Sequence, residues 1–379
     1  MKSMKVLIAG DFAPNSRCGD VLSEGNYDAV FDEVRPIIKQ HDYSIVNFEC
    51  AVVDVIHEVR PIDKVGPKLS CTSIAAEAIA YAGFNCTTLA NNHMRDYGDK
   101  GVRNTINFLQ RRNIDFVGGG VNSKDASKTL YKTVAGKKLA IINCCETEFN
   151  IATDSRAGAN PLNPIQQYYA ILEAKEKADV ILVIIHGGSE LLQVPTPRMI
   201  ETYRFFIDSG ADAVINHHQH CLCGYEVYKG KPIFYGLGNF CFDRPNEVQM
   251  WYEGMMISID FGEETCFDVI PYTQCKDDCS IKFVDKKVFL NRLEELNQKF
   301  KETSIYSEEI RKHYNMACRL IHDNLEPIKN RWLNALQKRG LFPSFLTRKK
   351  SKRLFNLVYC ESHRDKLYYY LKDILHIDN

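Results

Sequence analysis

The strongest constraint on the fold is an alternation of short apolar runs with longer segments in which apolar residues recur at helical spacing. The apolar runs cover residues 6–9, 43–48, 86–90, 139–144, 180–185 and 213–215. The segments with helical spacing cover residues 73–81, 101–112, 163–178 and 196–209. Such runs predict buried strands, and such spacing predicts helices between them. The chain is therefore predicted to be an α/β protein with helices on both sheet faces and antiparallel strands near residues 225–235 and 255–261.

Most of the predicted strands end in side chains that can bind a metal ion. These side chains are Asp11, Glu49, Asn92 with His93, His186, and His218 with His220. In an open α/β sheet, ligands bind at the carboxyl ends of the strands, so five such ends at one edge predict a shared site. Carboxylate, amide and imidazole ligands together suit Mn, Fe or Zn, and a carboxylate can bridge two ions. We therefore expect two divalent ions that activate a water molecule.

The sequence Asn91-Asn92-His93 also has a simpler interpretation. These residues follow a predicted strand and precede a helix that opens near Gly98. Asparagine is common in turns and at helix N-termini, so the segment could be a capping turn without a ligand role. Both interpretations stay open at the level of sequence.

The composition describes a chain that buries a large core and carries no overall charge. It has 379 residues, 45% of them hydrophobic, with 48 basic and 48 acidic side chains. This balance gives no reason to expect nucleic acid or an anionic membrane surface as a partner. The 14 cysteines include Cys144-Cys145 and Cys221-x-Cys223 but show no recurring spacing, which predicts buried thiols in a reducing compartment.

Neither end of the chain nor its interior suggests a membrane-spanning segment. The apolar run at residues 6–9 is too short for the core of a signal peptide, and no later run is long enough to cross a bilayer. We expect a cytoplasmic protein with no transmembrane segment.

The pattern changes near residue 285, where strand signals give way to charged helical patterns. We expect one domain over residues 1–284 and a C-terminal helical region over residues 285–379. A basic run at residues 347–353 and an aromatic tail with three tyrosines at 368–370 lie in this second region. A basic run is usually a solvated surface, so we expect the region to bind protein partners, if any, through its helices.

Seven short motifs carry a resemblance to a known family. They are Gly10-Asp11, Asn47-Phe48-Glu49, Asn91-Asn92-His93 with Asp96 and Gly98, Gly118-x-Gly120, residues 186–190 (His-Gly-Gly-Ser-Glu), His217-His218-x-His220, and residues 235–240 (Tyr-Gly-Leu-Gly-Asn-Phe). In order and spacing they resemble the CapA family of bacterial capsule and poly-γ-glutamate synthesis proteins. That family is related in fold to the calcineurin-like metallophosphoesterases. The resemblance covers residues 5–272 and implies a layered fold with mixed β-sheets flanked by helices.

The resemblance also implies roles for individual residues. It makes Asp11, Glu49, Asn92, His186, His218 and His220 the metal ligands, with Glu49 as the bridge. His93 falls where metallophosphoesterases place the histidine that assists the leaving group. Two departures change this pattern. Ala13 stands where these enzymes carry a histidine ligand, and Gly187 and Gln219 replace a tryptophan and a proline that are usual in the CapA family.

Four further residues are candidates with open alternatives. Arg17 and Lys68 could bind an anionic substrate, or could be ordinary surface charges. Glu190 could act as a base or orient a ligand, or could cap a turn. Asn239 could contact substrate, or could be a left-handed turn residue between glycines.

The function expected from the resemblance is a metal-dependent hydrolase of capsule or poly-γ-glutamate biosynthesis. Its substrate would be an anionic small molecule or polymer, cleaved at a phosphoester or a γ-glutamyl amide. A second reading is a non-catalytic scaffold that keeps the fold, which the absent histidine at position 13 favours.

Overall fold

The computed structural model describes residues 3–54, 59–64, 66–245, 247–313, 330–343, 346–348, 350, 351, 354 and 358. The chain divides into two compact units, Met1–Tyr306 and Ser307–Asn379. The predicted boundary at 284/285 therefore lies too early. Helix α9 (Lys286–Lys301) buries Phe289, Leu293 and Leu296 in the core of the first unit, which keeps it in that unit.

The first sheet carries the N-terminal strands. Strands β1 (Lys5–Phe12), β2 (Tyr43–Phe48), β5 (Cys86–Thr88) and β6 (Asp115–Val117) run parallel, in that order. On the other side of β1 lie β16 (Glu253–Phe261), β17 (Thr265–Gln274) and β18 (Ile281–Phe283), all antiparallel to their neighbours. The short strand β15 (Asn239–Cys241) pairs in parallel with the end of β1, opposite Asp11 and Phe12.

The second sheet is built from the middle of the chain. Its strands are, in order, β13 (Tyr225–Tyr228), β14 (Lys231–Phe234), β12 (Ala213–His217), β11 (Val180–His186), β9 (Lys137–Cys145) and β8 (Leu130–Val134). The four central strands are parallel, and the two edge strands are antiparallel to their neighbours. The structure thus has two large sheets, because strands β8, β9, β11, β12, β13 and β14 pair with one another, whereas β15 to β18 return to the first sheet.

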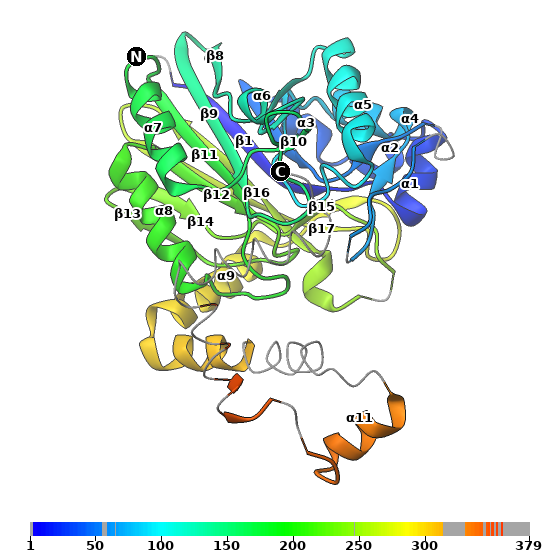
Figure 1. Ribbon diagram of the computed structural model, residues 1–379. Coiled ribbons are helices and arrows are strands. Elements are labelled where there is room, and N and C mark those ends of the chain that lie inside the picture. Colours follow the sequence, from blue (N-terminus) through cyan, green and yellow to red (C-terminus); the bar gives the residue numbers. More distant parts are fainter. Residues whose placement is uncertain are drawn as a thin grey trace. The chain divides into compact units, whose positions relative to one another are not determined.

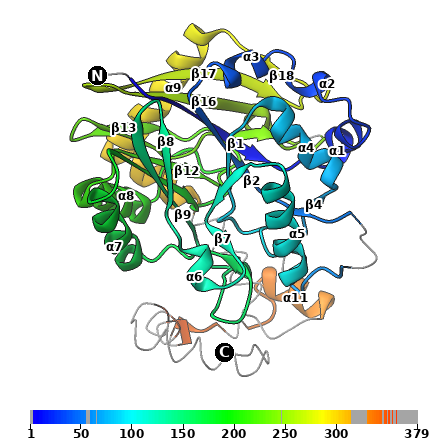
Figure 2. The same ribbon diagram turned by 90° about the horizontal axis from the view of Figure 1, so that it is seen from above.

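The two sheets pack face to face, and helices cover their outer faces (Figures 1 and 2). Along β1, Val6 and Ile8 enter the core between the sheets, whereas Leu7 and Ala9 pack toward the helices of the first sheet. That alternation is the two-residue period of a strand buried on both faces. The predicted layered α/β fold with mixed sheets flanked by helices is confirmed.

The remaining elements cover the sheets or join their strands. The first sheet is covered by α1 (Ser16–Ser23), α2 (Asp28–Phe31), α3 (Arg35–Lys39), α4 (Ser73–Ala82) and α5 (Gly98–Arg111), and the second by α7 (Pro164–Lys175) and α8 (Pro197–Ser209). The short elements are β3 (Ala51–Val52), β4 (Ser70–Cys71), β7 (Gly119–Gly120), α6 (Ser123–Ala126), β10 (Gly158–Ala159) and the 3₁₀ helix η2 (Gln249–Tyr252). In the second unit, the described residues include α11 (Arg331–Lys338).

Helix ends follow the local signals in the sequence. The side chain of Asn163 caps α7 and that of Thr196 caps α8, each ahead of a proline in the first turn. Gly83 ends α4 with φ of 100°, a left-handed conformation that favours glycine. Within the described part of the chain, no helix is long and apolar enough to cross a bilayer.

Candidate metal centre

The carboxyl ends of strands from both sheets meet at one place. Asp11 lies near the end of β1, Glu49 follows β2, and Asn92 lies in the turn after β5. From the second sheet, His186 ends β11 and His218 follows β12. These side chains, together with His220, are at most 8% exposed. The predicted convergence of the six ligand candidates is therefore present, with the two sheets each supplying part of the cluster.

Four of the candidates form one group, called here the four-ligand group: Glu49, Asn92, His186 and His218. His186 Nε2 lies 3.0 Å from Asn92 Oδ1, 3.1 Å from His218 Nδ1 and 3.5 Å from Glu49 Oε1. One ligand atom from each of Glu49, His186 and His218 lies within 4.8 Å of the others. These separations are short enough for the ligand atoms to bind one ion.

Asp11, Glu49 and His220 form a second group, called here the three-ligand group. His220 Nδ1 lies 3.4 Å from Asp11 Oδ2, and His220 Nε2 lies 3.7 Å from Glu49 Oε1. Their ligand atoms also lie within 4.8 Å of one another. Glu49 belongs to both groups, which is the position of a carboxylate that bridges two ions.

The Glu49 carboxylate is the side chain that most directly indicates a metal site. It is fully buried, and neither oxygen has a hydrogen-bond partner among the described residues. Burial and the neighbouring Asp11 charge raise the pKa of Glu49 well above its usual range. A buried carboxylate without partners is costly unless a cation balances it. The donor set around Glu49 therefore fits divalent metal ions.

The histidines of the two groups have different protonation states. Burial and the nearby His218 hold the pKa of His186 well below its usual range, and burial and the nearby His220 lower the pKa of His218 to about 4. Both rings are thus neutral near pH 7, which is the form that binds metal. Burial alone would lower the pKa of His220, but the Glu49 and Asp11 carboxylates outweigh it and raise the value to about 9.

Asp11 keeps its charge in spite of its burial. Desolvation alone would raise its pKa, but hydrogen bonds and charge from His217 and His220 hold the pKa well below its usual range. Asn47 Nδ2 also donates to Asp11 Oδ1 over 2.8 Å. An ionised carboxylate at the end of β1 is thus available as a ligand of the three-ligand group.

His93 belongs to a buried chain of polar groups beside the ligands. Its Nδ1 lies 2.6 Å from Asp96 Oδ2, and Asp96 also pairs with Lys64. Lys64 Nζ lies 3.4 Å from the Asn92 carbonyl oxygen, which it can reach as a donor. Burial lowers the pKa of His93 even though Asp96 acts in the opposite direction. The carboxylate fixes the ring orientation and leaves Nε2 as the reactive nitrogen.

Asn91 and Asn92 have different roles in the turn before α5. Asn91 is the residue that builds the turn, because its Nδ2 donates to the Phe48 carbonyl oxygen and its Oδ1 accepts from the His93 backbone N–H. No side-chain bond from Tyr97, the N-cap residue, caps α5. The capping alternative is therefore wrong for Asn92, whose oxygen instead faces His186 at 3.0 Å.

Three of the weaker candidates have roles other than the predicted ones. Arg17 forms an ion pair with Asp243 at 2.7 Å. Lys68 is exposed and donates to the Lys64 carbonyl oxygen, so Lys64 is the loop lysine that enters the site. Asn239 Oδ1 lies 2.9 Å from His220 Nδ1, which makes it an orienting partner of a ligand.

The position of Asn239 also excludes the turn alternative. Asn239 lies in β15, and the left-handed residue is its neighbour Gly238, with φ of 74°. Glu190 lies in the turn after β11 and is exposed. Its charge raises the pKa values of Glu49, His218 and His220, so it lies at the rim of the centre.

Sequence reasoning missed Lys64, Asn47 and His217 as parts of the site. Asn47 Nδ2 lies 3.2 Å from His186 Nδ1 as well as bonding Asp11, so it joins ligands from both sheets. His217 Nδ1 lies 3.4 Å from Asp11 Oδ1. Asn47 and His217 both belong to the motifs that resemble the CapA family. Each lies next to ligand candidates in the sequence, and this proximity could have identified them as parts of the site. Lys64 lies in an irregular loop with no local signal of burial.

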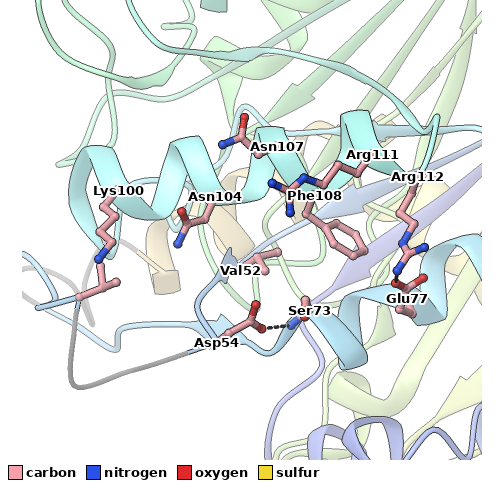
Figure 3. Close-up of a pocket in the computed structure, with 11 residues that line it drawn as sticks. Val52, Asp54, Ser73, Glu77, Lys100, Asn104, Asn107, Phe108, Arg111 and Arg112 are labelled. Atoms are coloured by element: carbon pink, nitrogen blue, oxygen red, sulfur yellow. Dashed lines mark hydrogen bonds and ion pairs between the residues drawn. The ribbon is translucent and has the colours of Figure 1, made fainter.

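A separate pocket of about 510 Å³ lies between α4, α5 and β3 (Figure 3). Lys100, Arg111 and Arg112 line it from α5, and Arg112 pairs with Glu77 of α4. None of its eleven lining residues is a ligand candidate. The metal centre is thus a distinct cluster of buried side chains.

Comparison with known proteins supports the assignment of these motifs. The family model described as "Bacterial capsule synthesis protein PGA_cap" matches residues 5–244. The capsule biosynthesis protein CapA of Bacillus anthracis is 33% identical over 251 residues, which cover 64% of this chain and 61% of the relative. The PGA biosynthesis protein CapA of Bacillus subtilis is 32% identical over 238 residues, which cover 62% of each chain. The chain thus matches about three fifths of the length of these relatives.

A solved structure is also similar, at low identity. The putative 5′-nucleotidase from Staphylococcus aureus matches with a TM-score of 0.43 and 16% identity, over 79% of this chain and 59% of that one. The family model, by contrast, covers more than half of this chain and contains all six ligand candidates, from Asp11 to His220. The chain belongs to the bacterial capsule synthesis protein family PGA_cap.

Proposed function

We propose that this chain is a metal-dependent hydrolase that acts in the synthesis of a capsule or poly-γ-glutamate polymer. The polymer is suggested by the names of the Bacillus relatives, which are capsule and PGA biosynthesis proteins. The hydrolase is suggested by one observation above all, the buried Glu49 carboxylate that lies between two ligand groups without a hydrogen-bond partner among the described residues.

The proposal assigns the four-ligand group to one divalent ion and the three-ligand group to another, with Mn, Fe or Zn as the metals that this donor set suits. When bound, such a pair supplies Lewis-acid activation of water and stabilises charge on the group under attack. Glu49 balances the positive charge from between the groups, and Asn239 holds the His220 ring through the contact at 2.9 Å.

His93 is assigned the proton transfer to the leaving group. Asp96 accepts a hydrogen bond from the Nδ1–H group of His93 over 2.6 Å. The Nε2 atom of the same ring is then the nitrogen available for proton transfer. Because its pKa is lowered by burial, His93 is neutral near pH 7 until an anionic substrate raises that pKa. We therefore expect protonation of His93 to accompany binding of an anionic small molecule or polymer.

The substrate class is tested by assaying the purified protein, loaded with Mn, against phosphomonoesters, phosphodiesters and γ-glutamyl peptides. The proposal expects turnover of one class that chelator removes and added metal restores. The matched control is the His186→Ala variant, which keeps the fold elements but loses a ligand of the four-ligand group. Turnover that survives both chelator and this variant would contradict the proposal.

A non-catalytic scaffold is the second candidate, and the short ligand set of the three-ligand group favours it. Ala13 is buried near the end of β1, so no side chain at that position reaches the ion. Elemental analysis separates the two candidates. A protein that holds no transition metal after purification without chelator, and gains none on incubation with Mn or Zn, would be a scaffold.

Protein partners are proposed for the C-terminal region. Among its described residues, Trp332 of α11 is 80% exposed and Leu341 is 72% exposed, which leaves apolar surface for a partner. Three residues of the basic run at 347–353 and the tyrosines at 368–370 lie outside the described residues. Substituting Trp332→Ala should leave hydrolysis by the purified protein unchanged while weakening association with a partner of the polymer-synthesis machinery, measured by co-purification.

A further inference from the structure

Four cysteines that are far apart in the sequence meet beside the end of the first sheet. Cys18 lies in α1, Cys241 ends β15, and Cys275 and Cys279 lie in the turn that joins β17 to β18. The first three are buried, and Cys279 is half-buried. Strands β15 and β17 lie side by side, which brings these segments together (Figure 1).

The sulfur atoms are close enough to share one ion. The Sγ atoms of Cys18, Cys241 and Cys275 lie within 4.8 Å of one another, and the pair Cys18–Cys241 is separated by 2.9 Å. Cys279 lies outside this group of three but shares the β17–β18 turn with Cys275, whose Sγ lies 3.9 Å from the Cys279 carbonyl oxygen. Sulfurs that bind Zn²⁺ at about 2.3 Å in a tetrahedron lie about 3.8 Å apart. A small spreading of the cluster therefore admits an ion.

The turn that carries two of the thiols is held in a defined shape. Cys275 has φ of 48°, a left-handed conformation, and its backbone N–H donates to the Ser280 carbonyl oxygen over 3.2 Å. Cys275 and Cys279 are separated by three residues, a spacing within the range of paired zinc ligands in turns. The shape and spacing both suit a pair of ligands from one turn.

An ion pair between the partly exposed Arg17 and the buried Asp243 connects the other segments around the cluster. Asp243 is fully buried and accepts bonds from Arg17 Nη2 at 2.7 Å and from the Cys18 backbone N–H at 3.3 Å. Arg17 Nη2 also donates to the Cys275 carbonyl oxygen over 3.0 Å. The guanidinium thus connects three of the segments that supply thiols, and its charge offsets the negative charge of thiolates.

We propose that Cys18, Cys241, Cys275 and Cys279 bind one Zn²⁺ as a structural site, separate from the metal centre at the strand ends. Binding converts four thiols to thiolates and releases four protons. Sulfur ligands select Zn²⁺, whereas the oxygen and nitrogen ligands of the other centre also accept Mn or Fe. The site ties α1 and the β17–β18 turn to β15, the strand that carries the His220 partner Asn239.

A disulfide between Cys18 and Cys241 is the competing chemistry. Their 2.9 Å separation is longer than the S–S bond of about 2.05 Å. A disulfide would also leave Cys275 without a role, although its sulfur lies within 4.8 Å of both sulfurs of the pair. The close approach of three sulfurs favours the ion.

The test uses the full-length protein, made metal-free under reducing conditions and titrated with Co²⁺ as a probe for Zn²⁺. The wild type should develop the thiolate-to-cobalt charge-transfer absorption and the intense visible bands of tetrahedral sulfur coordination. With Co²⁺ in excess over the three proposed sites, the intensity should correspond to one thiolate site per chain, and Zn²⁺ should displace the bands. The Cys279→Ser variant should weaken or lose this signature. The control Cys266→Ser changes an exposed cysteine of β17 outside the cluster and should keep it.

The His218→Ala variant should retain the thiolate signature, so this inference and the proposed hydrolase can fail independently. The titration of the wild type needs no variant to fold. Absence of thiolate charge transfer with Co²⁺ in excess over the three proposed sites would overturn the proposal. So would a Cys18–Cys241 disulfide found by mass spectrometry of protein purified without reductant and alkylated under denaturing conditions.

Discussion

The two ligand groups of the metal centre differ in how fully the chain supplies them. The four-ligand group has a carboxylate, an amide and two imidazoles, whereas the three-ligand group has Asp11, Glu49 and His220. The two groups share Glu49 but no other ligand candidate. Under the proposed assignment, we expect the four-ligand group to bind an ion more tightly than the three-ligand group.

Protonation sharpens the contrast. In the four-ligand group, His186 and His218 have lowered pKa values and are ready to bind metal near neutral pH. In the three-ligand group, the pKa of His220 is about 9, so a proton there balances Asp11 and Glu49 when no metal is bound. An ion entering the three-ligand group must displace that proton, which lowers its apparent affinity.

We expect the largest effect on metal binding and activity from Glu49→Gln, which removes the charge of the carboxylate that the two groups share. Both groups lose their common ligand, so bound metal and activity should fall to background. Stability should change in opposite directions in the two states. Without metal, the variant removes a buried carboxylate that lacks hydrogen-bond partners among the described residues and should gain about 1 to 3 kcal/mol.

With metal present, Glu49→Gln should instead lower the thermal midpoint relative to wild type, because ligand binding stabilises only a site that still binds. Calorimetry with and without Mn measures both differences. Metal content in the variant equal to that of wild type would contradict the bridging role of Glu49.

The next largest effect is expected from substituting one histidine at a time, which tests the two ligand groups separately. His218→Ala should remove the tightly held ion, and His220→Ala should remove only the weakly held one. Elemental analysis after dialysis should therefore show a larger loss for His218→Ala. Equal losses in the two variants would mean that the ions bind as one cooperative unit and that the ligand count does not rank them.

A smaller effect is expected from His93→Ala, which lies beside the ligands without belonging to either group. Metal content and thermal midpoint should stay close to wild type, whereas turnover should fall about a hundredfold or more, as on loss of a general acid. Asp96→Asn should keep the ring but lose its fixed orientation, with an intermediate rate. A fall in metal content in His93→Ala equal to that in His218→Ala would make His93 a ligand.

The ligands could be predicted from sequence because each one follows a strand or a motif. At these points a strand that is buried on both faces ends, so the next polar residue must lie at the edge of the sheet. Asp11, Glu49 and His186 are examples. The division into two sheets could not be predicted in this way, because a parallel strand has the same pattern whichever sheet it joins.

The partners of the ligands could not be predicted, because they depend on contacts between distant segments. Lys64 is buried by the packing of its loop against Asp96, which lies 32 positions further along the chain. The four clustered cysteines come from a helix, a strand and a turn, with no common spacing that a sequence pattern could reveal. Asn239 shows the same limit, since its turn-like sequence context concealed a contact to His220.

Asn239→Ala tests whether the three-ligand group depends on that contact. Loss of a partner that orients a ligand typically lowers metal affinity 10- to 100-fold. The weakly held ion should show this loss and the tightly held ion should not, as measured by calorimetric titration with Mn. Weaker binding of both ions would indicate that the variant disturbs β15 as a whole, and the selective role of Asn239 would be wrong.

The smallest effect is a dependence of affinity on pH that should be steeper in the three-ligand group. Because His220, with a pKa of about 9, must lose its proton to bind metal, the affinity of this group should rise about tenfold per pH unit up to that pKa. His218, with a pKa of about 4, is already neutral in this range, so only the raised pKa of the shared Glu49 adds a pH dependence to the four-ligand group. Calorimetric titrations at neutral and mildly alkaline pH measure both affinities.

The same protonation gives the metal-free protein the opposite trend in stability. A histidine whose folded pKa is raised from 6.5 to about 9 contributes stability that is complete below pH 6.5 and is lost as the pH rises through about 9. The raised pKa of Glu49 acts with the same sign, because its protonated form is also favoured by folding. The thermal midpoint of metal-free protein should therefore fall between pH 6.5 and about 9, and saturating metal should remove most of this fall. A midpoint that rises over this interval in chelator would show that no proton on His220 balances the two carboxylates, and the electrostatic contrast between the groups would be wrong.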